Sequence, residues 1–366
     1  DRSRGLGDVC KRQKYNIGLT IGVIVIMVYT FLGGYFAVVW TDFFQGMLMF
    51  FALMIVPIIA YGIISADFSS IIHSVPDNAQ YMSLVKGADG SAYSWQYIVS
   101  NLGWGLGYFG MPHILVRFMS IKSSDMIRKS RIIATIWVVI TLIASVIVGV
   151  MGYAYMTQTG MDIFTSSAGA ETIFMVLVQK LTPGFIGGIL LCAIVAAIMS
   201  TSDSQMLVTA SAVSNDVYKT VFKKKATDKE LLRVSRIAVI AVAVVAYVLA
   251  LNPDTSVMSL VSYAWAGLGA AFGPAMVLSL FWKRMTMSGA LAGMISGGLG
   301  VLVWSTYFTA SSPIFGDKYC IVDTGLYELV PAFALSVICI VVVSLLSPRP
   351  SQKVLDDFEK VKTVDI

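Results

Sequence analysis

The chain has 366 residues, of which 57% are hydrophobic and 13% are charged, and its formal net charge is +5. Soluble domains carry about a quarter charged residues, so this composition, with a mean hydropathy of +0.79, indicates a surface that faces mostly lipid. The four cysteines have no paired spacing and there are only two histidines, which argues against a disulfide framework and a histidine-based metal site. We expect membrane lipid around the chain, and no cofactor or nucleic-acid partner.

A membrane-spanning helix needs about 20 mostly apolar residues. Nine segments meet this requirement: 16–39, 41–64, 94–118, 132–156, 184–212, 233–251, 258–282, 287–308 and 326–347. We therefore predict an all-α integral membrane protein, built as one bundle of about nine spans. The first fifteen residues are polar and basic, and no short apolar stretch with a small-residue cleavage site follows, so no cleavable signal peptide is predicted.

Lysine and arginine are concentrated in the loops on one side of the predicted bundle, and such loops are cytoplasmic. The opposite loops, 65–93, 157–183, 252–257 and 309–325, have at most one each. This predicts a multi-pass plasma-membrane protein with its tail, 348–366, in the cytoplasm. The basic residues on the cytoplasmic side are Arg117, Lys122, Arg128, Lys129, Arg131, Lys219, Lys223, Lys224, Lys225, Lys229, Arg233, Arg236, Lys283, Arg284, Arg349, Lys353, Lys360 and Lys362.

The N-terminal stretch conflicts with this orientation. Nine spans place residues 1–15 outside, yet they include five lysines and arginines. Either a span is miscounted or further helices precede the chain, and we favour the second interpretation. After the first predicted span, Asp42 lies in a very short cytoplasmic turn. Its role there is either a solvated N-cap of the next helix or a gate.

The third predicted span contains Asn101-Leu-Gly-Trp-Gly-Leu-Gly-Tyr-Phe-Gly-Met-Pro-His113. Glycine and proline weaken a helix and expose backbone groups, and a hydrophobic segment interrupted in this way indicates the central site of a transporter. Trp104 and Tyr108 are four residues apart and share a helix face, so they are candidates for the wall of a substrate pocket. The alternative is that the glycines only let helices pack closely.

The fifth predicted span ends in Ala196-Ala-Ile-Met-Ser-Thr-Ser-Asp-Ser-Gln205. Hard cations prefer oxygen ligands, and the Ala197 carbonyl with the Ser200 and Thr201 hydroxyls would supply half of a sodium coordination shell. The alternative is that these hydroxyls bond back to their own helix. Asp203 favours a functional interpretation, because a carboxylate in a span is usually functional, unless it lies fully solvated at the cytoplasmic mouth.

The seventh predicted span is rich in small residues, and we interpret its Tyr263 and Trp265 as packing aromatics. Walker A, G-x-S-x-G and H-E-x-x-H motifs are absent from the sequence. ATP-driven transport and hydrolytic chemistry therefore have no support, and we do not expect an enzyme.

Three stretches together resemble the sodium:solute symporter family: GWGLGYFGMPHILVRFM at 103–119, AIVAAIMSTSDSQMLV at 193–208 and LVSYAWAGLGAAFGP at 260–274. The likeness runs in order over about 16–348 and includes GALAGMISG at 289–297. The pattern of Trp104, Tyr108 and Pro112 is similar to that of the proline-transporting branch.

The resemblance implies a LeuT-type fold of two inverted five-helix repeats, and symport of one Na⁺ with L-proline by alternating access. It implies that 16–64 is the end of the first repeat, 94–282 the second repeat and 287–347 two additional helices. By the same resemblance Ala197, Ser200 and Thr201 are sodium ligands, and Trp104, Tyr108 and Pro112 are substrate-site residues. Asp42, Asp203 and Ser204 are candidates for gating or coupling.

The sequence departs from the family pattern in three places. Met111 stands where many proline symporters have glutamine, and Ser204 where they can have cysteine. Family members also have about four helices before the stretch Tyr29–Val38, including the helix that supplies the other half of both sites. We therefore expect an N-terminally truncated chain with a sodium half-site, whose partner is its missing N-terminal half.

Three alternatives to proline symport by this chain remain open. One is symport of another small solute such as pantothenate, which the methionine at 111 suggests. Another is a fragment that transports nothing by itself. The third, a sensor module of a signalling protein, is disfavoured because only about 19 residues follow the last predicted span.

Overall fold

The computed structural model describes residues 2–64, 83–87, 90–164, 167–251, 257–310 and 318–362 and, in the first helix, the side chains of 15–31 and 37–64. Parts of the four predicted loops 65–93, 157–183, 252–257 and 309–325 lie outside the described residues. The last four residues of the tail and the side chains of the basic N-terminal stretch up to residue 14 also lie outside them.

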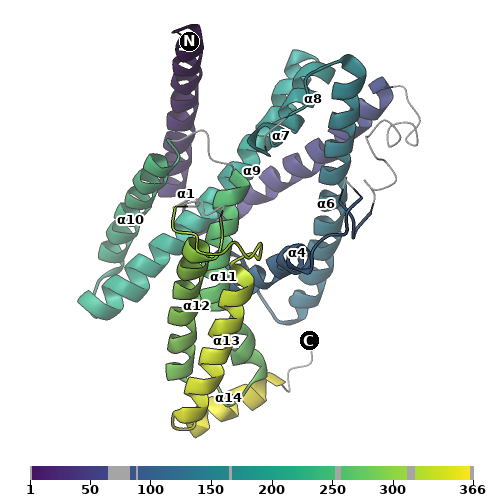
Figure 1. The fold of residues 1–366 in the computed structure, drawn as a ribbon. Helices are drawn as coiled ribbons and strands as arrows, with labels where there is room; N and C mark the ends of the chain where they lie inside the picture. The colour runs from purple at the N-terminus through teal and green to yellow at the C-terminus, as the bar shows by residue number, and fades with distance from the viewer. Residues whose placement is uncertain are drawn as a thin grey trace. The chain divides into compact units, whose positions relative to one another are not determined.

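In the described part of the chain, regular structure is helical apart from one isolated antiparallel bridge between Lys86 and Ala92. Two elements are not α-helices: η1 is a 3-10 helix and η2 is a π-helix. The elements in chain order (Figure 1) are α1 (Arg2–Ile64), α4 (Trp95–Gly107), η1 (Tyr108–Gly110), α5 (Pro112–Met119), α6 (Asp125–Thr159), α7 (Ser167–Ala170), α8 (Ile173–Leu181), α9 (Gly184–Ser211), η2 (Ala212–Phe222), α10 (Asp228–Leu249), α11 (Val257–Phe281), α12 (Met287–Tyr307), α13 (Leu329–Leu346) and α14 (Gln352–Lys362).

Seven helices among the described residues are long and apolar enough to cross a membrane. They are Ala37–Ile64 within α1, then α6, α9 with η2, α10, α11, α12 and α13. The predicted all-α membrane class is therefore confirmed. One of the nine predicted spans differs, because 94–118 is divided into α4, η1 and α5. The predicted span 16–39 stays a prediction: its described part is apolar helix, and the side chains of 32–36 lie outside the described ones.

The predicted turn between the first two spans is wrong. Residues 16–64 belong to the single helix α1, and Asp42 lies inside it rather than in a cytoplasmic turn. In the sequence, a single carboxylate within an apolar run is typical of a loop. Inside a packed helix it needs a polar neighbour, and for Asp42 that neighbour is Ser204 of α9. In Figure 1 the first, darker part of α1 and its later part run in different directions.

The interruption of the third predicted span is confirmed. α4 is followed by one turn of 3-10 helix, Met111 is extended with φ −81° and ψ 109°, and Pro112 begins α5 at its first turn. Proline suits this position because its missing N–H has no partner in the first turn of a helix.

The chain divides into two compact units. Unit 1 consists of Asp1–Ser74 and Thr135–Asp254, and unit 2 consists of Val75–Ala134 and Thr255–Ile366. Unit 1 contains α1, most of α6, and α7 to α10 with η2. Unit 2 contains α4, η1, α5, the start of α6, and α11 to α14. The predicted boundaries 16–64, 94–282 and 287–347 are drawn from the family's helix repeats, whereas these two units are defined by contacts. The units therefore do not test the boundaries, which stay a prediction.

In unit 1, α9 packs along α1 and also contacts α8 and α10. One buried cluster joins the early part of α1 to α9 and α10 through Ile26, Met206 and Ala238. A second joins the later part of α1 to α6, α8 and α9 through Val56, Val148 and Leu190. α1 thus holds α9, which carries the predicted sodium ligands, over much of its length.

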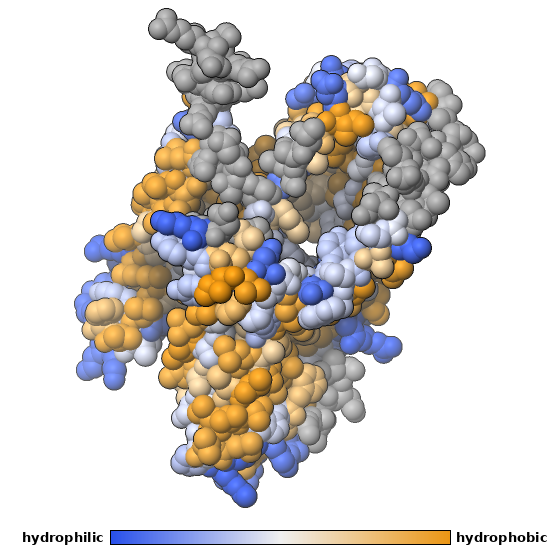
Figure 2. Space-filling view, viewed as in Figure 1, coloured by the Kyte–Doolittle hydropathy of each residue, from blue (hydrophilic) through white to orange (hydrophobic). Residues whose placement is uncertain are grey.

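In unit 2, α11, α12 and α13 pack together, and α4 and η1 lie against α11. Ala266, Ala270, Val301, Leu329 and Ala332 form the buried core of these helices. Figure 2 shows hydrophobic side chains over the outer side of α12 and α13, with hydrophilic side chains at the end near α14. An apolar outer face of this kind suits contact with lipid.

Candidate functional site

The predicted sodium ligands lie close together on α9. The Ser200 and Thr201 hydroxyls each lie 3.1 Å from the Ala197 carbonyl oxygen and donate hydrogen bonds to it. Ligand oxygens about 2.4 Å from a cation of calcium's size are about 3.4 Å apart when they bind at right angles. The distance from each hydroxyl to the carbonyl oxygen is therefore close to the spacing of neighbouring ligands in a cation shell. The bonds also match the alternative, hydroxyls bonded back to their own helix, so the ligand roles stay a prediction.

Asp203 lies two residues after Thr201 and is completely buried, between α9 and α1. The Tyr29 hydroxyl of α1 donates a hydrogen bond to its Oδ2 atom. Its Oδ1 atom is buried without a hydrogen-bond partner in the described part of the chain. The alternative of a fully solvated Asp203 is therefore wrong, and the carboxylate belongs to the packed α1–α9 contact.

Ser204 lies between the sodium candidates and Asp42. Its hydroxyl is 2.9 Å from the Ser200 carbonyl oxygen and 3.4 Å from Asp42 Oδ2. A hydroxyl donates one hydrogen, and the shorter contact is the stronger bond. The structure thus brings all three gating candidates, Asp42, Asp203 and Ser204, to the same α1–α9 contact.

The predicted substrate residues of unit 2 surround the break after α4. The Trp104 ring lies nearly parallel to the rings of Trp265 and Tyr327, with centroids 5.6 and 5.9 Å apart. Tyr108 meets Trp265 edge to face at 4.8 Å, and its own side chain is 50% exposed. Trp104 is partly covered by its aromatic neighbours, so Tyr108 presents more open surface to a solute.

Trp265 also holds the break in place. Its indole Nε1 donates a 3.0 Å hydrogen bond to the Trp104 carbonyl, in the last turns of α4. Because the helix is interrupted, such carbonyls need partners from outside it. The interpretation of Trp265 as a packing aromatic is consistent with this contact, which also places it against two predicted substrate residues.

Several glycines of the third predicted span have the packing role that we left open. A Cβ atom on Gly107 would overlap the Trp265 indole, and one on Gly110 would lie 2.5 Å from the Leu268 carbonyl oxygen. A Cβ on Gly269 of α11 would in turn lie 2.7 Å from the Gly107 Cα. The backbones of α4, η1 and α11 therefore touch. Gly105 differs, because a Cβ there would meet nothing within 4 Å.

Tyr327 and Tyr29 were not predicted by any motif. The Tyr327 hydroxyl donates a 2.6 Å bond to the Ser262 carbonyl, and its N–H donates a 2.9 Å bond to the Ser100 hydroxyl. Tyr327 comes from the segment before α13, far from both partners in the sequence. No local pattern in the sequence marks either tyrosine.

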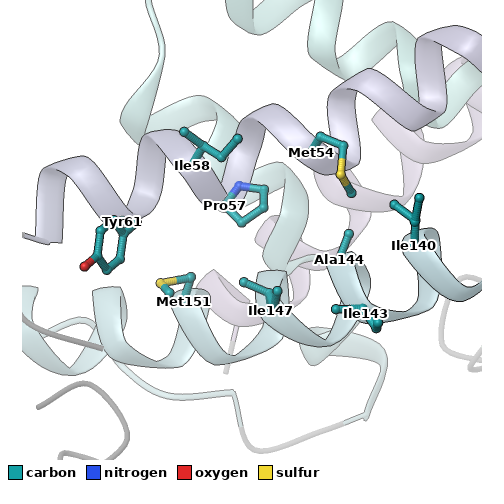
Figure 3. Close-up of a pocket in the computed structure, with 9 residues that line it drawn as sticks. All are labelled: Met54, Pro57, Ile58, Tyr61, Ile140, Ile143, Ala144, Ile147 and Met151. Carbon is teal, nitrogen blue, oxygen red and sulfur yellow. The ribbon is translucent and has the colours of Figure 1, made fainter. Parts of the chain in front are cut away.

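An apolar groove of about 440 Å³ lies between α1 and α6 (Figure 3). Met54, Ile58, Ile143 and Met151 are among its lining side chains, and Tyr61 has the only side-chain polar atom there. An amino acid would find almost no hydrogen-bond partners in it, and a cation almost no oxygen ligands. This groove is therefore not the solute or sodium site.

Comparisons with known proteins agree with these features. Residues 12–297 match the model of the sodium:solute symporter family. The chain belongs to the sodium:solute symporter family. It is 44% identical over 338 residues to the osmoregulated proline transporter OpuE of Bacillus subtilis, covering 92% of this chain and 65% of the relative. The high-affinity proline transporter PutP of the same organism is 43% identical, with 94% and 68% covered.

A further relative of this symporter-family chain is sodium/proline symporter 2 of Staphylococcus saprophyticus, 41% identical, with 96% of the chain and 66% of the relative covered. The chain thus spans about two thirds of the length of these relatives. The solved structure of a Na⁺-coupled sialic acid symporter, substrate-bound and outward-open, matches with a TM-score of 0.69 at 18% identity, over 92% of this chain and 68% of that one. The symporter fold is therefore shared, and the matched proteins are transporters rather than enzymes.

Proposed function

We propose that this protein carries L-proline across the plasma membrane together with Na⁺. The observation that carries the proposal is the extent of the likeness: proteins named as proline transporters or sodium/proline symporters are 41–44% identical over 92–96% of the chain. Na⁺ acts as the coupling ion, and the carrier alternates between states open to either side. The finer form of the fold is a LeuT-type pair of inverted repeats with 94–282 as the second repeat and the C-terminus in the cytoplasm.

Ala197, Ser200 and Thr201 are the proposed sodium ligands on α9. The support is the small cluster of three oxygens in unit 1, which has no fixed charge of its own and so suits weak, reversible binding of a hard cation. Asp42, Asp203 and Ser204 couple this cluster to α1, because the Ser204 hydroxyl bonds the Ser200 carbonyl and lies near Asp42.

Trp104, Tyr108 and Pro112 are the proposed substrate residues in unit 2. The support is the interrupted helix, at which the aromatic rings gather around backbone that is not helical. An apolar wall of this type matches the pyrrolidine ring of proline, and freed backbone groups at a broken helix suit its charged groups.

Uptake of labelled L-proline tests the sodium assignment, in bacteria that lack their own proline uptake and express the whole coding region that includes this chain. Ser200→Ala and Thr201→Ala should each raise the half-saturating Na⁺ concentration about ten-fold, the equivalent of about 1.4 kcal/mol. Thr209→Ala is the matched control, because its hydroxyl bonds back to Gln205 on the same helix. Unchanged sodium dependence in both site variants would remove the ligand assignment.

The 366-residue chain by itself forms a second arm of this experiment. We expect no coupled uptake from it, since it spans about two thirds of the length of the proline transporters that it matches. Sodium-driven proline uptake by the chain alone would contradict this expectation.

Symport of another small solute is the second candidate. Met111, where many proline symporters have glutamine, lies at the break itself and its side chain is 2% exposed. A tenfold excess of unlabelled pantothenate or other small carboxylates, added to the proline uptake assay, distinguishes the two solutes. If such a compound inhibits the uptake of labelled proline at a lower concentration than unlabelled proline does, this second candidate is favoured.

A further inference from the structure

A cavity of about 490 Å³ lies in unit 2 at the end of two spans. Its wall includes Lys283 and Arg284, just after α11, together with Leu345 and Arg349 at and after the end of α13. Asp356 and Glu359 of α14 complete its polar lining. The three cations outnumber the two carboxylates, so the cavity carries a net positive charge.

Neither of the two carboxylates forms an ion pair with an arginine of the cavity wall. Glu359 lies 3.7 Å from Lys283 in an exposed ion pair, and Asp356 accepts a 3.0 Å hydrogen bond from Gln352. Among the described residues, no ion pair involves Arg284 or Arg349. Both guanidinium groups therefore line the cavity without an ion pair to a carboxylate in the described part of the chain.

Arg284 is held in a fixed position. One of its terminal nitrogens, Nη2, lies 2.8 Å from the Ser347 carbonyl and 3.4 Å from the Leu345 carbonyl at the end of α13. The other, Nη1, is buried and has no hydrogen-bond partner in the part of the chain that the structure describes. A guanidinium fixed by one edge keeps its remaining N–H groups ready for a planar or tetrahedral oxyanion.

The cavity lies at the border of the apolar surface, and this position favours a lipid head group as the anion. α11 and α13 end at Phe281 and Leu346, whose side chains are 79% and 83% exposed, and Met287 at the start of α12 is 81% exposed. Figure 2 shows the hydrophobic outer side of α12 and α13 ending near α14 in hydrophilic residues. The cavity thus lies where an apolar, lipid-facing surface ends, at the level of lipid head groups.

We propose that this cavity binds the phosphate of an anionic membrane phospholipid. Arg284 and Arg349 hold the phosphate oxygens, and Lys283 adds to the positive field. The acyl chains lie along the exposed aliphatic side chains at the ends of α12 and α13. Basic pockets at the ends of membrane helices suit lipid head groups in this way, whereas a soluble anion gains nothing from the apolar border.

Native mass spectrometry of the purified protein in mild detergent tests the proposal. Phosphatidylglycerol is the probe, phosphatidylcholine the zwitterionic comparison and inorganic phosphate the soluble one. We expect retained phosphatidylglycerol, and a higher unfolding temperature with this lipid than with phosphatidylcholine or phosphate. Arg349→Gln should weaken lipid binding about five-fold, as expected for one basic residue at a membrane surface.

Lys353→Gln is the matched control, because it removes the same charge from α14 at a residue outside the cavity wall. Arg284→Gln should also weaken lipid binding. Because Arg284 also bonds the end of α13, that variant could lose binding through a change in the protein's own structure. Arg349→Gln is therefore the variant that tests the proposal. Unchanged lipid retention in Arg349→Gln, an equal loss in Lys353→Gln, or equal stabilisation by phosphatidylcholine or phosphate would each overturn the proposal.

Discussion

The Tyr29 hydroxyl donates a hydrogen bond to the buried Asp203 carboxylate, joining α1 to α9. Asp203 lies two residues after Thr201, so the bond is next to the predicted sodium ligands on α9. A buried carboxyl group that loses a donor is costly because water cannot replace it. Tyr29 therefore bears directly on the packing behind the proposed sodium cluster.

Tyr29→Phe should lower the free energy of unfolding by about 1–3 kcal/mol, measured as a lower unfolding temperature in detergent. The matched control is Tyr15→Phe, on the same helix, which removes an exposed 2.8 Å bond to the Ala250 carbonyl. It should have a much smaller effect, because water replaces that bond. Equal shifts in the two variants would show that the buried bond to Asp203 contributes nothing special.

Gly107→Ala should destabilise unit 2 by about 1–3 kcal/mol, the usual cost of overpacking. The new methyl group would overlap the rigid Trp265 indole and displace it from the Trp104 carbonyl. Gly105→Ala, two residues away on α4, should be neutral or slightly stabilising, because it meets nothing within 4 Å and alanine favours a helix. Thermal unfolding in detergent measures both. Equal stability of the two variants would contradict the contact between α4 and α11.

The class of fold was predictable from sequence because a bilayer restricts spanning segments to long apolar helices. The break near Gly107 and Pro112 was predictable for the same reason, since those residues weaken a helix in a way visible along the chain. The turn at Asp42 was a wrong prediction. Nothing local reveals that Ser204, 162 residues away, lies beside that carboxylate.

The candidate site was predictable only where its residues are neighbours in sequence. Ala197, Ser200 and Thr201 share one turn of α9, so periodicity places them together. Tyr327 reaches Ser100 across 227 residues and lies against Trp104, and only the packing of α13 on α4 creates these contacts. Short motifs contain no information about such pairs.

Tyr327 should affect substrate affinity through the Trp104 ring. Tyr327→Leu removes the ring that lies nearly parallel to Trp104, and should raise the KM for proline uptake several-fold by loosening that wall. Tyr327→Phe keeps the ring and loses only the 2.6 Å bond to the Ser262 carbonyl, so it should retain most of the affinity. Uptake kinetics of the whole coding region measure both variants. A KM that rises equally in both would assign the effect to the hydroxyl bond instead.

Glu328 should make the stability of unit 2 depend on pH. It lies just before α13, is 7% exposed, and lines a polar cavity of about 320 Å³ with Ser262, Ser305 and Asp323. Burial raises the pKa of its carboxyl group above the ordinary value, and a hydrogen bond from its own backbone N–H only partly opposes this. The folded protein therefore holds the proton more tightly than the unfolded chain.

The sign of the effect follows from this difference in proton affinity. The stability due to protonated Glu328 is fully present below the ordinary glutamate pKa of about 4.3, and it is lost as the pH rises through the higher pKa of the folded state. Glu328→Gln stays neutral, so its unfolding temperature should equal that of the wild type near pH 4 and exceed it near pH 8. The control Glu359→Gln, at an exposed side chain, should show no such divergence. Parallel pH profiles of Glu328→Gln and the wild type would show that the carboxyl group of Glu328 titrates as freely in the folded protein as in the unfolded chain.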